Sequence, residues 1–169
     1  EETSGAACES LNHGRADCVL LALPYACGDI ESEILFEDRP FLAYPGNEQP
    51  PETATADTID EKRLLLLEDG HCLKDHVLSA CNRPELRANA AMLGTSLHTL
   101  VQMVDNGLGV TMLPEMAIEA NILANTGITT RPLVADHPSR SIALAWRRAS
   151  PRGKEFELLA NVLREVTGR

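Results

Sequence analysis

Continuous apolar runs separated by polar breaks divide the chain into short strands. Three runs are typical of strands buried on both faces, at residues 16–24, 62–69 and 86–92. Further short strands, bounded by Gly, Pro or charged residues, are predicted at 31–38, 39–46, 110–113, 128–134 and 140–146.

Helical spacing of apolar residues appears between these strands. It predicts helices over residues 3–13, 72–81, 96–105 and 153–168, the third with Ser96 or Thr95 as its N-cap. The last helix should turn five apolar side chains inward: Phe156, Leu159, Val162, Leu163 and Val166. Strands that alternate with helices in this way predict an α/β protein with largely parallel sheets.

Composition narrows the possible functions. The chain has 169 residues, is 44% hydrophobic and has a net charge of −10, so its surface is unsuited to bind nucleic acid unaided. We expect no membrane span, because no apolar run approaches about 18 residues, and no export signal. Five cysteines are an odd number and fit a reducing compartment, so we expect a cytoplasmic protein.

Two of these cysteines, Cys72 and Cys81, lie nine residues apart in the predicted helix LEDGHCLKDHVLSAC. Nine helical steps separate them by roughly 13 Å on opposite faces, whereas a disulfide needs Cα atoms within about 7 Å. Oxidation to a disulfide would therefore require the helix to unwind. Cys72 follows Gly70 at a helix start, next to His71 and Lys74, a setting that lowers a thiol pKa and favours reaction with peroxide.

Two other interpretations of this pair stay open at the level of residues. Buried cysteines usually pack as small apolar side chains. A metal site is also possible, because His71 and Asp75, and Cys72 and His76, are each four residues apart. No CxxC motif or second ligand cluster supports a metal, and we expect neither metal nor cofactor.

The remaining cysteines have less suggestive surroundings. Cys18 lies within an apolar strand, Cys8 can face either side of the first helix, and Cys27 lies in a loop that we expect to be exposed. We predict that all three are structural or incidental.

The cysteine segment resembles the regulatory domain of LysR-type transcriptional regulators, and most specifically the peroxide-sensing OxyR group. That group has the pattern L-E-D-G-H-C-L-R-D with a second cysteine nine residues after the first. GRADCVLLAL, TSLHTLVQMVDNGLGVTMLP and SRSIALAWRRASPRGKEFELL resemble the same domain in order and spacing. The resemblance covers essentially the whole chain.

The resemblance implies a periplasmic-binding-protein-like fold of two α/β lobes joined by crossing strands. The first lobe would comprise residues 1–38 and 142–169, and the second residues 39–141. It also implies that the winged helix-turn-helix domain and the opening strand and helix of the first lobe are absent. The expected partners are hydrogen peroxide, a second regulatory domain in a homodimer, and, in a full-length tetramer, DNA and RNA polymerase.

Carried over position by position, the resemblance makes Cys72 the peroxidatic cysteine and Cys81 the resolving one. His71 and Asp75 match residues that shape the peroxide pocket, and Arg147 matches an arginine that stabilises the thiolate or the reduced pocket. Lys74 stands where arginine is usual, and its ammonium cannot repeat a planar guanidinium's paired contacts.

The resemblance also supports an alternative function. Ser96 matches a position that contacts small organic effectors between the lobes of other LysR-type domains, although a plain N-cap explains it equally well. A thiol peroxidase is a third possibility, without a visible peroxidase scaffold. Sensing uses one oxidation per event, so we expect a regulator and not an enzyme.

Overall fold

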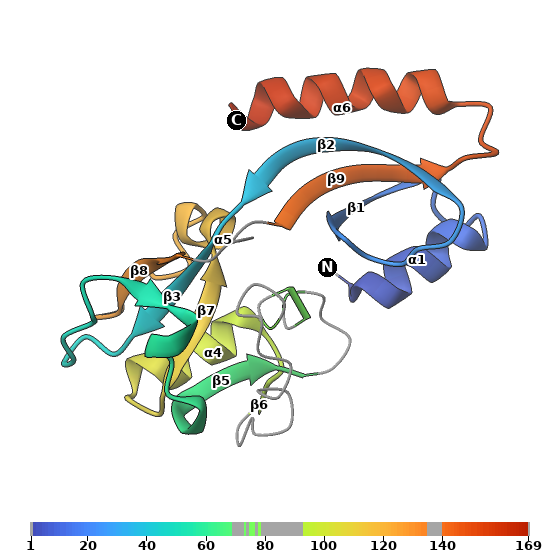
Figure 1. The fold of residues 1–169 in the computed structure, drawn as a ribbon. Coiled ribbons are helices and arrows are strands. Elements are labelled where there is room, and N and C mark those ends of the chain that lie inside the picture. Colours follow the sequence, from blue (N-terminus) through green and yellow to red (C-terminus); the bar gives the residue numbers. More distant parts are fainter. Residues whose placement is uncertain are drawn as a thin grey trace. The chain divides into compact units, whose positions relative to one another are not determined.

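The computed structural model describes residues 2–68, 73, 75, 76, 78, 93–134 and 140–168. The chain divides into two compact units: residues 1–37 with 140–169 form unit 1, and residues 38–139 form unit 2. Each unit combines strands with helices (Figure 1), so the predicted α/β class is confirmed. The strand predicted at residues 86–92 lies outside the described residues.

Unit 1 has a three-stranded sheet in the order β1-β9-β2. Its elements are α1 (Ser4–Asn12), β1 (Cys18–Leu23), β2 (Ile30–Asp38), β9 (Arg140–Arg147) and α6 (Gly153–Thr167). β1 and β9 are antiparallel, with Cys18 opposite Trp146. The prediction of largely parallel sheets is therefore wrong for this unit.

The two helices of unit 1 cover opposite faces of its sheet, α1 on one and α6 on the other (Figure 1). Side chains alternate across a strand, so neighbours on β9 belong to different clusters. Ala145 packs with Leu11 of α1, whereas Leu144 and Trp146 pack with Phe156 of α6. The sheet thus separates two small apolar cores.

The exposure of α6 differs from the predicted pattern. Phe156, Ala160 and Leu163, which recur at helical spacing, make the contact with the sheet. The three other predicted inward residues are largely exposed: Leu159 at 40%, Val162 at 54% and Val166 at 79%. This narrow stripe of apolar residues is enough to pack α6 on the sheet, because the helix contacts only one face of the sheet.

Strand β1 is also less covered than its apolar sequence suggests. Leu20 is 57% exposed, although Leu21 and Ala22 are buried. β1 lies at the edge of the sheet, where packing from neighbouring elements is thinner. The prediction of a strand buried on both faces is therefore only partly correct.

Unit 2 has a six-stranded sheet in the order β4-β8-β3-β7-β5-β6. Its strands and helices are β3 (Pro40–Tyr44), β4 (Ala54–Thr55), β5 (Leu64–Leu67), β6 (Leu93–Gly94), α4 (Leu97–Asp105), β7 (Val110–Pro114), α5 (Glu115–Glu119) and β8 (Thr129–Val134). Two short 3₁₀ helices, Ala56–Thr58 and Glu61–Arg63, precede β5. The sheet is mixed, because β3 is antiparallel to β7 and β8 while β5 is parallel to β6 and β7.

Helix α4 forms where the sequence predicts it. The Ser96 side chain accepts a hydrogen bond from the Thr99 N–H, as an N-cap should. Its apolar residues Leu100, Val101 and Val104 are buried, each no more than 1% exposed. This helix provides one wall of the main core of unit 2.

Strand β5, which precedes Cys72 and Cys81 in the sequence, and strand β6, which follows them, lie side by side in the sheet. They pair in parallel, with Leu66 opposite Leu93 and Leu67 opposite Gly94. The Glu68 N–H extends the pairing with a 3.1 Å hydrogen bond to the Gly94 carbonyl. The strand before Cys72 and the strand after Cys81 are therefore neighbours in the sheet.

Candidate redox site

The predicted redox residues fall mostly outside the described part of the chain. This holds for His71, Cys72, Lys74 and Cys81. Asp75 is described, has helical backbone and is exposed. Residues 73, 76 and 78 also have helical backbone, as predicted for this segment.

Two leucines anchor the cysteine segment in the core of unit 2. Leu73 is 9% exposed and Leu78 is 3% exposed, and both belong to the main cluster together with Leu100. Burial of a leucine side chain is worth roughly 1.5–3 kcal/mol. Both anchors lie between Cys72 and Cys81 in the sequence, so any rearrangement that joins the cysteines acts on these two contacts.

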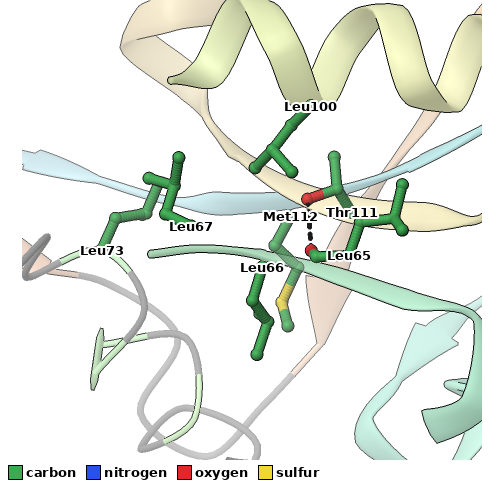
Figure 2. Close-up of a pocket in the computed structure, with 7 residues that line it drawn as sticks. All are labelled: Leu65, Leu66, Leu67, Leu73, Leu100, Thr111 and Met112. Carbon is green, nitrogen blue, oxygen red and sulfur yellow. Dashed lines mark hydrogen bonds between the residues drawn. The ribbon is translucent and has the colours of Figure 1, made fainter. Parts of the chain in front are cut away.

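Unit 2 contains a small apolar pocket, and Leu73 is one of the residues around it (Figure 2). It is lined by Leu65, Leu66, Leu67, Leu73, Leu100, Thr111 and Met112. The Thr111 hydroxyl is buried and donates a 2.8 Å hydrogen bond to the Leu65 carbonyl, which satisfies it. No charged side chain is among the described residues that line it. Apart from this bonded hydroxyl, the side chains that line the pocket are apolar.

Ser96 already has a structural role at the start of α4. Its hydroxyl oxygen accepts a 3.2 Å hydrogen bond from the Thr99 N–H and lies 3.1 Å from the Thr99 hydroxyl. Thr95 lies 3.4 Å from the same threonine hydroxyl. A ligand at Ser96 would compete with these contacts, which are worth about 1 kcal/mol for a typical N-cap.

Arg147, at the end of β9, makes its described contacts within unit 1. Its guanidinium donates to the Leu11 carbonyl and, at 2.8 Å, to the Ala16 carbonyl. It also lies 4.0 Å from the Asp17 carboxylate. The Leu11 carbonyl lies in the last turn of α1 and the Ala16 carbonyl lies just beyond that helix. The predicted contact with the Cys72 thiolate stays a prediction.

Replacement of Arg147 by Met should lower the free energy of unfolding by about 2 kcal/mol, because hydrogen bonds from a charged donor to two carbonyls are lost. Arg148→Met is the matched control. Arg148 is 62% exposed and pairs with exposed Asp29, so its loss should cost less than about 1 kcal/mol. Urea unfolding of the reduced variants measures both values. Unchanged stability together with slower oxidation of Cys72 would instead assign Arg147 to the thiol.

The cysteines without a predicted role include a bonded pair. Cys8 of α1 and Cys27 form a disulfide, with Cα atoms 5.4 Å apart and a sequence separation of 19. The predicted exposure of Cys27 is wrong, because this residue is only 3% exposed. Nothing local in the sequence marks the pair, since its residues meet only when α1 folds against the sheet.

Cys18 is a free thiol of intermediate exposure. Burial raises its pKa, the neighbouring Asp17 carboxylate raises it further, and Arg152 lowers it. A raised thiol pKa leaves less reactive thiolate near neutral pH. The structural prediction for Cys18 fits this setting.

The described residues contain no group of three or more side chains placed to hold a metal ion. Among the same residues, no helix has the length and apolarity needed to cross a membrane.

The fold and sequence define the class of protein. The family described as LysR substrate binding domain matches residues 1–168, and the chain belongs to that family. Its fold is the type 2 periplasmic-binding-protein-like fold predicted above.

Solved OxyR regulatory domains are close structural matches. The reduced OxyR2 domain of Vibrio vulnificus has a TM-score of 0.89 and 34% identity, covering 98% of this chain and 79% of that one. The reduced Pseudomonas aeruginosa OxyR domain has a TM-score of 0.80 and 32% identity, covering 96% and 79%.

Curated relatives include regulators with different names. The HTH-type transcriptional regulator EstR of Acinetobacter baylyi is 36% identical over 94% of this chain and 53% of its own length. A probable hydrogen peroxide-inducible genes activator of Streptomyces viridosporus is 36% identical over 98% and 54%. The Escherichia coli dual regulator OxyR is 34% identical over 91% and 51%. The chain thus spans about half the length of these relatives.

Proposed function

We propose that the chain is the hydrogen-peroxide-sensing regulatory domain of a LysR-type transcription factor, switched by a reversible disulfide between Cys72 and Cys81. The GHCLKD motif with its second cysteine carries the proposal. Likeness to OxyR regulatory domains and to peroxide-inducible activators supports it.

The chemistry uses one peroxide and two thiols. The Cys72 thiolate attacks a peroxide oxygen, the O–O bond breaks, and a sulfenic acid and hydroxide form; the hydroxide takes up the proton that Cys72 released on ionisation and becomes water. The Cys81 sulfur then attacks the sulfenic sulfur and displaces a second water, leaving a disulfide. Two sulfurs lose one electron each, and the peroxide gains both. His71, Lys74 and Asp75 are the side chains that we assign to binding the peroxide, and a cellular dithiol reverses the oxidation.

Formation of the Cys72–Cys81 disulfide changes the conformation of the segment because it acts on the buried residues Leu73 and Leu78. A helix cannot bring Cys72 and Cys81 within disulfide distance, so the segment between them has to rearrange. Displacement of Leu73 and Leu78 from the core opposes the change by roughly 1.5–3 kcal/mol each. The free energy of oxidation offsets this cost. Reduction of the disulfide lets both leucines return to the core.

We assign the two compact units to the two lobes of the regulatory domain. In the whole protein, such domains form a dimer within a tetramer, and a separate N-terminal domain binds DNA and positions RNA polymerase. A regulator of this kind works in the cytoplasm beside its DNA and does not turn over peroxide.

Mass mapping of thiols tests the proposal directly. The reduced chain is exposed to one equivalent of peroxide, quenched, alkylated and digested. The expected product links the peptides of Cys72 and Cys81. Oxidation confined to the other cysteines would overturn the assignment.

Likeness to EstR, whose name does not mention peroxide, favours one alternative: an effector domain that binds a small organic ligand near Ser96. Calorimetry of the reduced chain against metabolites tests it. A tight ligand whose affinity falls in Ser96→Ala, while Thr95→Ala binds normally, would support this function.

A further inference from the structure

The Cys8–Cys27 pair lies in unit 1 and has no part in the proposed switch, whose cysteines belong to unit 2. It joins the middle of α1 to the chain between β1 and β2. Both cysteines belong to a buried cluster with Leu11, Leu21 and Ala145. The question is what a bond at this position does.

Contacts other than the disulfide also hold α1 against this loop. The Asn12 side-chain amide donates a 3.4 Å hydrogen bond to the Cys27 carbonyl. A Cβ atom on Gly28 would lie 3.3 Å from the Asn12 oxygen, so backbone and side chain are in close contact. A Cβ on Gly5 would lie 3.5 Å from the Tyr25 hydroxyl. None of these contacts involves a sulfur atom, so reduction of the disulfide removes none of them directly.

We propose that Cys8 and Cys27 are a second redox pair, which closes without rearrangement and fastens α1 to the loop after β1. Peroxide oxidises one thiol to a sulfenic acid with loss of water, and the other thiol displaces a second water as the disulfide forms. Two electrons pass from the sulfurs to the peroxide. The resulting disulfide stabilises unit 1 and leaves its fold unchanged.

Burial gives this bond a distinct reactivity. Cys8 is 6% exposed and Cys27 is 3% exposed, so a bulky thiol reductant has little access to either sulfur. Exchange requires α1 to open locally. In the folded chain the disulfide should therefore resist a thiol reductant. The same reductant should reduce it rapidly once the chain is unfolded.

The test uses the Cys72→Ser/Cys81→Ser chain, which lacks the proposed switch. Its fully reduced form is treated with peroxide, alkylated and digested with trypsin and chymotrypsin. Cleavage after Tyr25 separates Cys18 from Cys27. The expected product links Cys8 to Cys27 and leaves Cys18 alkylated.

The consequence is measured on the same chain in both redox states, so that no further substitution is needed. Closing a loop across 19 residues should raise the unfolding temperature by about 5–10 °C. Amide exchange in α1 should slow, while exchange in α4 of unit 2 stays unchanged. When Cys8→Ser and Cys27→Ser are added to this Cys72→Ser/Cys81→Ser chain, both responses to peroxide should disappear.

Three results would overturn the second pair. They are the absence of the Cys8–Cys27 link, a link with no change in unfolding temperature, and oxidation that changes α4 as much as α1. Each is independent of the proposed switch, because its cysteines are absent from the tested chain. Loss of peroxide sensing at Cys72 would leave this inference unaffected.

Discussion

The Cys72→Ser chain should form no disulfide at Cys81 and should lose its fast reaction with peroxide. A thiol of ordinary pKa near 8.5 is only a few per cent ionised at pH 7, whereas a thiol with a lowered pKa is largely thiolate. Ionisation alone then makes Cys72 about thirtyfold faster than an ordinary cysteine. Stopped-flow peroxide consumption, with mass mapping of the product, measures the loss.

Cys81→Ser is the informative partner variant. It should keep the fast first step and accumulate a sulfenic acid at Cys72, because the second thiol is missing. A sulfenic-acid probe detects the product. Cys18→Ser is the control and should behave as the unchanged chain, since Cys18 has a raised pKa. Equal rates for the Cys72→Ser and unchanged chains would contradict the proposed site.

Leu78→Ala should favour the disulfide. Leu78 is 3% exposed within the main cluster, and our proposal assigns this packing to the reduced chain, so truncation should destabilise the reduced form by about 3 kcal/mol. If oxidation withdraws Leu78 from the core, the oxidised form loses much less. The equilibrium constant for the Cys72–Cys81 bond should then rise by about a hundredfold. Equilibration in dithiothreitol buffers, followed by alkylation and mass spectrometry, measures it.

Leu64→Ala is the matched control for Leu78→Ala. Leu64 is also 3% exposed and belongs to the same cluster, but it lies in β5 and outside the cysteine segment. Its truncation should lower the unfolding free energy by a similar amount in both redox states. The disulfide equilibrium should barely move. Equal shifts for the two variants would mean that oxidation leaves Leu78 in place.

The sequence predicts local elements of this fold well. Periodicity alone locates α4, with its N-cap at Ser96, and strands such as β5 and β7. These elements have strong signals because each buries one continuous stripe or run. The short elements β4 and α5 were not predicted, since two or five residues are too few to show a period.

Features that depend on distant contacts could not be predicted from the pattern. Cys8 and Cys27 meet only through the packing of α1, and the antiparallel pairing of β1 with β9 joins opposite ends of the sequence. Leu73 and Leu78 are apolar residues in the motif, but only the structure shows them in the core of unit 2. The candidate site is therefore predicted by its motif, whereas the burial of the two leucines becomes visible only in the structure.

The pairing of β5 with β6 confines what the cysteine segment can transmit. Because Leu67 and Gly94 lie opposite each other in parallel strands, both ends of the chain between them are held at the sheet. A rearrangement that withdraws Leu73 and Leu78 from the core would therefore change the packing beneath the segment and the surface above it, while β5 and β6 keep the two ends of this chain together.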